Sequence, residues 1–262
     1  MKRKVSSELT LQGLIYAPPV SKDACKLAAT LPGLSGSTLS SLLVNYSPAA
    51  KGKLVLPRIG RPVAEVWLEP GSKTLALNPG NPVVLDIEYG PEFIMSVLAA
   101  EEDHNLWKLR LVGGSGGLSR PIKAKSYQNC RACDIIVDLL LEVGEIAGEI
   151  EPDQYLPQWN RQAGLAYMAL EAMMVNFNQT WRMASTGEVW VGQEAWVTYP
   201  EVVRLGEAHK GQSKIALAGV EPNLGPGVEL HGYWGEFKGR VGRVDRVVHH
   251  FDARAWTQVH CW

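Results

Sequence analysis

Short runs of alternating apolar and polar residues, separated by glycine and proline, recur along this chain from residue 53. Six of these runs lie in its first half, at residues 54–56, 63–68, 74–77, 83–87, 93–99 and 105–112. Alternation with a period of two is typical of β-strands that bury one face. Turn residues separate the runs, and the chain has 26 glycines and 16 prolines in total. Consecutive hairpins that form a small barrel or sandwich are therefore expected.

Two helices are predicted in the middle of the chain. Apolar residues recur at helical spacing over residues 132–143, with Asn129 as the expected N-cap and Gly144 as the expected end. The second helix is predicted to start near Asn160. Its expected packing stripe contains Leu165, Met168, Ala169, Ala172, Met173 and Phe177. Both helices are predicted to be packing elements.

A Trp-rich hairpin is predicted after the second helix. Residues 180–184 and 188–191 are aromatic and β-branched, and they are joined by a turn in which Gly187 can take a positive φ. A second group of strands is expected after Gln193, ending in residues 243–249 and 255–261. The sequence thus predicts an α+β fold that is rich in β-strands.

Four segments follow from this reading. Residues 1–52 are predicted to form an extended N-terminal arm, in which residues 9–15 could be a strand but prolines interrupt any long element. Residues 53–118 form a first β-barrel module, and residues 119–192 form the helical insertion with its Trp-rich hairpin. Residues 193–262 are expected to form a C-terminal β module.

Several loose motifs follow one another in a recognisable order. They are residues 107–118, Pro157-Gln-Trp159, Arg161-Gln-Ala-Gly164, Trp181-Arg182, residues 187–192, residues 224–230 and residues 242–249. This order resembles the tail-hub proteins of contractile-tailed bacteriophages, the late-control protein D and Mu-like baseplate-hub families. The resemblance covers residues 54–262, and this chain is shorter than the usual hub.

The resemblance implies tail-tube-like β-barrel modules interrupted by a two-helix insertion, with residues 193–262 completing a second barrel. It also implies a structural virion protein of the tail baseplate, assembled in the host cytoplasm. In that family three copies form a ring, in which two tube-like modules per chain imitate a sixfold layer. The implied partners are a hexameric tail tube, a trimeric central spike and other baseplate proteins, and the genome would pass through the lumen of the ring. Two alternatives are a tail-associated cell-wall hydrolase and the hub of a phage-derived contractile injection system.

The charge of the chain is balanced overall but unevenly distributed. The net charge is −1, which gives no global field that would favour a membrane or sequence-specific binding of nucleic acid. No membrane-spanning run and no signal peptide are expected. Residues 1–53 contain seven Lys or Arg and two acids, whereas residues 134–153 contain seven acids and no base. Both segments could be solvated faces, or they could contact neighbouring subunits of opposite charge, with Asp134, Asp138 and Glu142 as the acidic candidates.

Tryptophan is the residue type most closely tied to interfaces in this sequence. The chain has nine Trp, most of them on predicted strands or at the ends of elements. Core filling accounts for many of these, but Trp is also a common anchor of protein interfaces. Trp234 and Trp262 are the interface candidates because they lie beside segments rich in glycine and charge.

The sequence predicts no catalytic residue, metal site or cofactor, and therefore no enzyme. Residues 113–117 form a glycine run after a strand, but without the Lys and Ser/Thr of a phosphate-binding loop they are interpreted as a hinge. Glu101, Glu102, Asp103 and His104 are expected at a hairpin tip, where adjacent carboxylates are usually solvated rather than held apart in a cleft.

Histidine and cysteine clusters also lack the spacing of a metal site. His249 and His250 are strand neighbours that point to opposite faces, so they would not share an ion with His260 and Cys261. Cys130 and Cys133 form the one CxxC pattern, at the start of a helix. With no further ligand pair nearby, they are interpreted as reduced, partly buried thiols.

Overall fold

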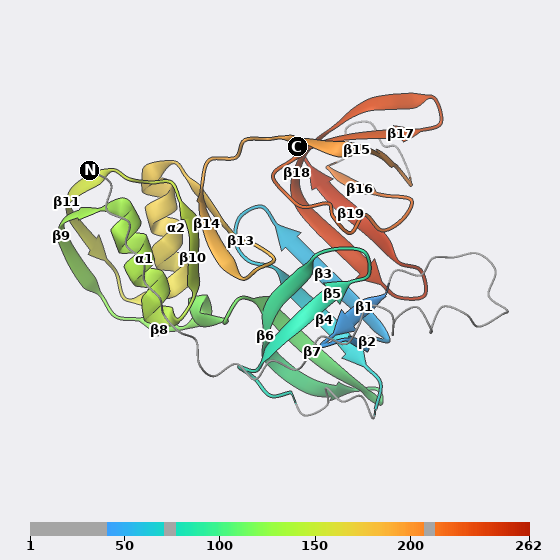
Figure 1. Ribbon diagram of the computed structural model, residues 1–262, viewed down its shortest axis with the longest axis horizontal. Helices are drawn as coiled ribbons and strands as arrows, with labels where there is room; N and C mark the ends of the chain where they lie inside the picture. Colours follow the sequence, from blue (N-terminus) through green and yellow to red (C-terminus); the bar gives the residue numbers. More distant parts are fainter. Residues whose placement is uncertain (1–40, 71–76, 207–212) are drawn as a thin grey trace, which may run out of the picture. The chain divides into compact units, whose positions relative to one another are not determined.

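Twelve strands form one continuous sheet around which the molecule is built (Figure 1). The computed structural model describes residues 41–70, 77–206 and 213–262, all of which belong to a unit that starts at Leu39. The strands are β1 (Leu42–Val44), β2 (Ser47–Pro48), β3 (Lys51–Pro57), β4 (Val63–Leu68), β5 (Pro82–Ile87), β6 (Glu92–Asp103), β7 (Leu106–Gly113), β15 (Thr198–Arg204), β16 (Lys214–Ala216), β17 (Glu229–Trp234), β18 (Phe237–Phe251) and β19 (Trp256–Cys261). Their hydrogen-bonded order is β15-β17-β18-β3-β4-β7-β6-β5-β1-β2, with β19 between β18 and β16.

The first barrel module is formed by strands β1 to β7. Strict alternation places Leu54 and Leu56 of β3 in the core and Lys51 and Lys53 on the outer face, as the sequence pattern predicts. Five of the six predicted strands coincide with β3 to β7. The sixth, at residues 74–77, lies almost entirely outside the described residues, as does the predicted strand at residues 9–15.

The sheet begins earlier than the predicted first module. Strand β1 pairs with β5 through Leu42↔Ile87 and Val44↔Leu85, so residues 42–52 belong to the barrel rather than to an arm. The pairing is non-local, and Leu42 and Val44 are fully buried by it. The remainder of the expected arm, residues 1–40, lies outside the described residues.

The second barrel module consists of β15 to β19. Strand β15 pairs with β17, β17 with β18, β18 with β19 and β19 with β16. Two backbone bonds then close the circuit, from Gly206 N to Ala216 O and from Ala218 N to Arg204 O. Buried residues of both modules form one hydrophobic cluster, so the two barrels share a core.

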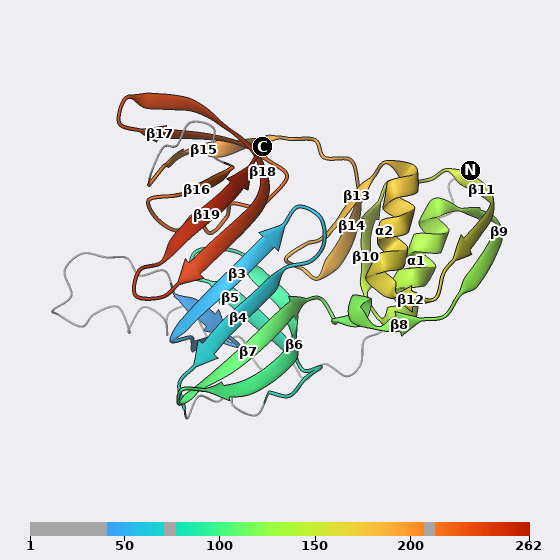
Figure 2. The ribbon, with the colours of Figure 1, turned by 180° about the vertical axis from the view of Figure 1, so that it is seen from behind.

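Strand β18 belongs to both modules. Its first half, up to Arg243, pairs with β17, whereas Arg246 to Phe251 pair with β3 of the first module. On its other edge β18 pairs with β19. Figure 2 shows β18 and β3 side by side where the two modules meet. The fold is thus the predicted α+β, β-rich class with barrel modules.

A separate layer carries the two helices. It contains β8 (Pro121–Ile122), β9 (Lys125–Arg131), α1 (Ala132–Val143), β10 (Ile146–Ile150), β11 (Tyr155–Arg161), β12 (Gly164–Leu165), α2 (Ala166–Phe177), β13 (Thr180–Met183) and β14 (Glu188–Gly192). Figure 1 shows the helices between the β9–β11 ribbon and the β10–β14–β13 sheet. This insertion has its own hydrophobic core, built from residues 118–191. Neither described helix is long and apolar enough to cross a membrane.

The predicted start of each helix was wrong. Asn129 is not an N-cap but lies in β9 with φ 52°, and α2 begins at Ala166 rather than near Asn160. Residues 125–131 and 155–161 instead pair as an antiparallel ribbon. Neither helix has a side-chain cap; the first helical N–H of α1 donates to Gln154 O, and that of α2 donates to Arg120 O. Backbone from other segments thus replaces the capping side chain.

The predicted end of the first helix and the predicted hairpin were correct. Gly144 ends α1 in the left-handed conformation, with φ 77°. Strands β13 and β14 pair as predicted, and Gly187 takes φ 81° in their turn.

The buried face of α2 differs from the predicted stripe. Ala166, Leu170, Met173 and Met174 are buried. By contrast, Leu165 just before the helix and Met168 within it are exposed. The helix is apolar on more than one face, so its spacing alone could not identify the buried face.

Candidate assembly interface

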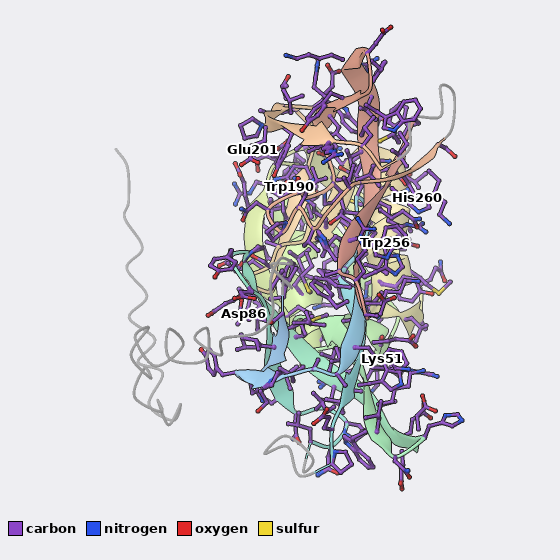
Figure 3. All side chains as sticks on the ribbon, turned by 90° about the vertical axis from the view of Figure 1, so that its right-hand side faces the viewer. Lys51, Asp86, Trp190, Glu201, Trp256 and His260 are labelled. Carbon is purple, nitrogen blue, oxygen red and sulfur yellow. The ribbon has the colours of Figure 1, made fainter. Side chains whose placement is uncertain are left out.

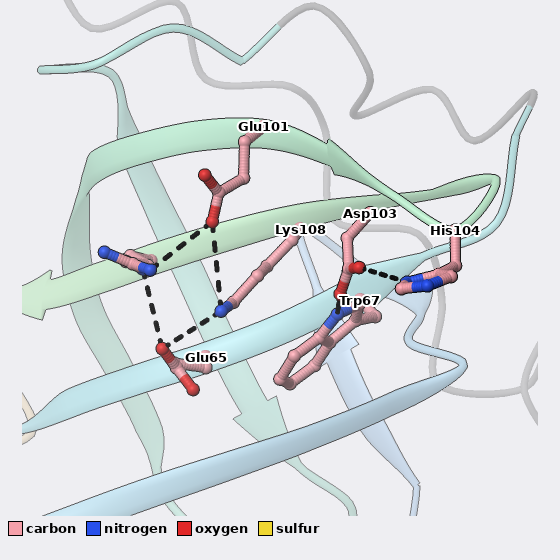
Figure 4. Close-up of polar contacts among 7 residues, drawn as sticks. Glu65, Trp67, Glu101, Asp103, His104 and Lys108 are labelled. Carbon is pink, nitrogen blue, oxygen red and sulfur yellow. Dashed lines mark hydrogen bonds and ion pairs between the residues drawn. The ribbon is translucent and has the colours of Figure 1, made fainter.

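The tip of the β6–β7 hairpin holds the carboxylates that the sequence singled out (Figure 4). His104 and Asn105 take φ 50° and 63°, as a two-residue turn between right-twisted strands requires. Asp103 accepts a hydrogen bond from Trp67 Nε1 at 2.7 Å and lies 2.6 Å from His104 Nδ1. These two hydrogen bonds hold the pKa of Asp103 below its usual value.

The neighbouring acids are paired on the outer face of the sheet. Glu101 lies 3.4 Å from Arg110 and 3.9 Å from Lys108, and Glu65 lies 3.5 Å and 3.3 Å from the same two groups. Figure 4 shows this alternation of two acids and two bases. Both carboxylates are about half exposed. The arrangement is a surface ion-pair network on an open sheet, and it lacks the enclosed cleft of a carboxylate catalyst.

A basic face covers the outer side of the sheet where the two barrel modules meet. We use this name for the following residues: Lys51, Lys53, Lys214, Arg246, His250 and His260. Strand pairing brings them together, because Lys53 lies opposite His250 and His260 lies opposite both Arg246 and Lys214.

An aromatic pair lies within the basic face. His250 stacks on Trp256, with ring centroids 4.2 Å apart and planes inclined by 6°. Partial burial and the nearby Lys53 lower the pKa of His250. Partial burial, Arg246 and Lys214 likewise lower the pKa of His260. Near neutral pH both rings therefore favour the neutral form and leave the lysines and arginine as the charges of this face.

His249 points the other way, into the core. Its side chain is fully buried, and Nδ1 lies 3.0 Å from Thr257 Oγ1. Burial lowers the pKa of His249 to about 3. His249 and His250 thus occupy opposite sides of β18. Among the described residues, no cluster of three or more His, Cys, Asp or Glu could hold a metal ion.

An acidic surface lies on the opposite side of this unit. It consists of the following residues: Asp86, Glu88, Glu92, Glu201 and Glu221. Figure 3 places Asp86 and Glu201 on one side and Lys51, Trp256 and His260 on the other. The turn between β5 and β6 reaches the second module, because a Cβ on Gly90 would lie 2.7 Å from Cβ of Pro222, the residue after Glu221.

Trp262 takes part in a cluster of aromatic rings and arginines. It meets Trp196 edge to face at 5.3 Å, and the Arg243 guanidinium lies 5.0 Å from the Trp196 ring and 5.8 Å from the Trp262 ring. The cluster borders a cleft of about 320 Å³ that Arg58 and Glu194 also line. Trp262 is 63% exposed, so this predicted interface residue presents a large aromatic surface to solvent.

Trp234 lies elsewhere. It pairs with Phe237 at the tip of the β17–β18 hairpin, is half exposed and lines a groove of about 960 Å³ together with Arg204 and Arg254. Trp262 pairs instead with Arg243. In β18, Arg243 comes six residues after Phe237, and six residues of strand span about 20 Å. The two predicted tryptophans therefore belong to separate surfaces.

The predicted acids of α1 are paired within the insertion. Asp134 lies 3.1 Å from Arg131, and Asp138 lies 2.6 Å from Lys125. Glu142 lies 2.7 Å from the buried Arg161. A partner subunit would have to compete with these internal cations, so the basic face and the acidic surface are better interface candidates.

Cys130 and Cys133 are free, partly buried thiols, which matches their interpretation from the sequence. Cys133 Sγ lies 3.4 Å from Asp153 Oδ1. Burial and this hydrogen bond raise the pKa of Cys133 and so favour the unreactive thiol form.

The signal for the two charged surfaces was present in the sequence but incomplete. Alternation places Lys51 and Lys53 on one side of a strand, and Asp86 and Glu88 on one side of another segment. The strands that lie next to them are set by pairing between segments far apart in the chain. The periodicity of a single sequence does not report such pairing.

Comparison with known proteins identifies the fold. The sequence matches no family model and no curated protein sequence. Among solved structures, the 43 kDa tail protein of prophage MuSo2 from Shewanella oneidensis has a TM-score of 0.65 at 7% identity, covering 84% of this chain and 96% of its own. The tail protein of Neisseria meningitidis MC58 has a TM-score of 0.60 at 8% identity, with 84% and 95% covered.

A third similar structure comes from a secretion system. It is an Escherichia coli component of the type VI secretion system that is structurally similar to the T4 bacteriophage tail proteins gp27 and gp5. Its TM-score is 0.61 at 9% identity, covering 87% of this chain and 75% of its own. The described part of this chain therefore has a fold that it shares with phage tail proteins.

Proposed function

We propose that this chain is a structural baseplate hub of a phage tail, in which three copies form a ring that joins the hexameric tail tube to the trimeric central spike. The observation that carries the proposal is the pair of barrel modules in one chain, which share strand β18 and one core. Three copies with two modules each would present six barrel positions to a sixfold tube. The fold shared with phage tail proteins supports this role.

The ring follows from the physics of repeated contacts. A heterologous contact, in which one surface of a copy meets a different surface of the next, leaves no free end when the rotation closes. The exposed surfaces around Trp234 and Trp262 lie about 20 Å apart along β18 and could meet different partners. Tail tube, spike and other baseplate proteins are the partners we propose, in a virion assembled in the host cytoplasm.

The segments have distinct roles in this proposal. Residues 42–118 and 193–262 supply the two tube-like modules, and residues 119–192 supply the helical insertion. The genome passes through the lumen without sequence-specific contacts. We propose no catalytic activity, because the carboxylates at the β6–β7 tip form surface ion pairs.

A second candidate is the hub of a phage-derived contractile injection system. The structural likeness to a type VI secretion component favours it. The assembly mechanics would be the same, so the genomic context distinguishes the two: a neighbouring capsid gene would favour a phage.

The first experiment is the mass of the full chain in solution by light scattering, alone and with purified tube and spike proteins. We expect a trimer, either alone or once the spike is added, and a complex that contains both partners. A chain that stays monomeric and binds neither partner would refute the hub proposal.

A further inference from the structure

The basic face carries cations that the chain itself does not neutralise. Within the described residues, Lys53, Lys214 and Arg246 form no ion pair. The acids beside these cations have closer partners: Glu65, which lies opposite Lys53, is bound to Lys108 and Arg110. Asp245, near His260, is bound to Arg58, and Asp252, near His250, accepts a hydrogen bond from Arg254 N. A concentration of like charge on a sheet face repels itself and attracts a surface of opposite sign.

The acidic surface has the complementary property. Asp86 lies directly opposite Glu92 on the neighbouring strand, an arrangement in which like charges destabilise the pairing. None of its five carboxylates forms an ion pair with a Lys or Arg in the described part of the chain. Partial burial and the neighbouring acids raise the pKa of Asp86 and of Glu221, as expected where negative charges are crowded.

Each surface also exposes an aromatic ring. Tyr89 is 82% exposed in the turn between Asp86 and Glu92. On the basic face, the stacked His250 and Trp256 offer a flat aromatic platform beside the lysines. A contact between the two surfaces would therefore combine charge complementarity at its rim with aromatic burial.

We propose that the basic face of one copy binds the acidic surface of the next copy, so that the chain assembles head to tail. This inference rests on the ring of the proposed function and assigns the two surfaces that join its copies. A second copy fits better than nucleic acid because the same chain carries both complementary surfaces, on different sides of one unit (Figure 3). Repeated contacts between unlike surfaces close into a ring when the rotation between successive copies divides a full turn, and they form an open filament otherwise.

Charge reversal on each surface tests the proposal. One variant carries Lys53→Glu and Lys214→Glu, and another carries Glu92→Lys and Glu201→Lys. Each should weaken self-association by about tenfold or more in dissociation constant, because like charges then face each other. A chain with all four substitutions has both charges exchanged, and it should recover association toward the wild-type value. Recovery of association in this chain would show that the single-surface variants fail through charge repulsion and not through misfolding. Thermal unfolding of every variant checks folding independently.

Matched controls carry the same charge changes elsewhere. Lys123→Glu and Glu171→Lys, both in the helical insertion, alter exposed residues outside both surfaces, and they should leave the mass unchanged. All masses are measured by light scattering at low and high salt, alone and with tube and spike proteins. Wild-type association should weaken as salt rises, since the Debye length falls to about 3 Å at 1 M.

Three results would overturn the inference, and they are distinguishable from failure of the hub proposal. If all reversal variants stay trimeric and still bind tube and spike, the surfaces are wrong while the hub role stands. If the basic-face variant keeps its mass but loses binding to a DNA duplex that the wild type retains, the face is a nucleic-acid site. If the wild type binds neither itself nor the two partners, both proposals fail.

Discussion

The buried imidazole of His249 couples the stability of the second module to pH. Its pKa is about 3 in the folded chain, below the ordinary value of 6.5, because burial disfavours the charged form. Above pH 6.5 both folded and unfolded states are neutral and the stability is fully present. As pH falls from 6.5 toward 3, only the unfolded state binds the proton, so stability is lost.

This gives a prediction for the slope of stability against pH. Urea unfolding between pH 7 and 4 should show a loss of up to about 1.4 kcal/mol per pH unit from His249. His249→Gln should remove most of that slope, while His250→Gln, at the outer face, should leave most of it. An unchanged slope in His249→Gln would contradict the assignment.

Arg161 shows what a buried charge requires. The side chain is almost fully buried and donates to Glu142 at 2.7 Å, to Tyr127 Oη at 3.2 Å and to Lys123 O at 3.0 Å. Arg161→Met should destabilise the insertion by about 3 kcal/mol in urea unfolding, because Glu142 loses its ion-pair partner and Tyr127 Oη and Lys123 O each lose a hydrogen bond. The exposed pair Arg131–Asp134 is the matched control, and Arg131→Met should leave the free energy of unfolding almost unchanged, because both groups are solvated. Equal losses in the two variants would contradict this account.

Among the elements, the glycine run after β7, which the sequence predicted to be a hinge, is a close-packed junction. A Cβ on Gly117 would lie 2.0 Å from Val143 O, a backbone atom at the end of α1. Gly116 also takes φ 76° and precedes a single turn of 3-10 helix at Gly117–Ser119. The glycines therefore let the chain leave the barrel and pass in close contact with the C-terminal end of α1.

Gly117→Ala should consequently destabilise the protein by about 2 kcal/mol or more, because backbone must move to admit one methyl group. Gly225→Ala is the control, since a Cβ there meets nothing within 4 Å. Thermal unfolding of both variants measures the difference. A Gly117→Ala variant as stable as the control would show that the junction can relax.

The same elements show where sequence reasoning succeeds and where it stops. Strands β4 and β7, the end of α1 at Gly144 and the turn at Gly187 follow from local alternation and glycine conformation, and all were predicted. The β9–β11 ribbon was missed because its two strands are separated by α1 and β10. The starts of the helices were misplaced because backbone carbonyls from distant segments, rather than local side chains, accept their first N–H groups.

For the whole molecule, the two exposed tryptophans can be tested directly. Trp262→Ala and Trp234→Ala should each leave folding intact, because both side chains are at least half exposed. If these surfaces meet partners, each substitution should weaken assembly with tube or spike by about tenfold or more. Trp181→Ala is the contrasting control, because that ring is buried in the insertion and its loss should cost about 3–5 kcal/mol of stability. Light scattering of the mixtures measures assembly, and thermal unfolding measures stability. If assembly is unaltered in both Trp234→Ala and Trp262→Ala, the surfaces around these two residues are not part of the interface.

The arrangement of surfaces was harder to predict than the fold class. Barrel modules and a helical insertion follow from alternation, turn residues and helical spacing. The basic face, however, combines Lys53 with His250 and Lys214 with His260, pairs far apart in sequence that only the folded sheet brings together. Charge patterning along the chain pointed instead to Asp134, Asp138 and Glu142, whose carboxylates bind cations of the insertion.

Strand β18 also has a mechanical consequence. Its 15 residues correspond to about 50 Å of contour length, and one covalent backbone runs through both barrels. Hydrogen bonds between antiparallel strands lie perpendicular to the strands. Tension along β18 would therefore load its bonds to β17 and β3 together in shear, rather than breaking them one after another. In the proposed hub, a pull on one barrel would therefore be transmitted directly to the other through this shared strand.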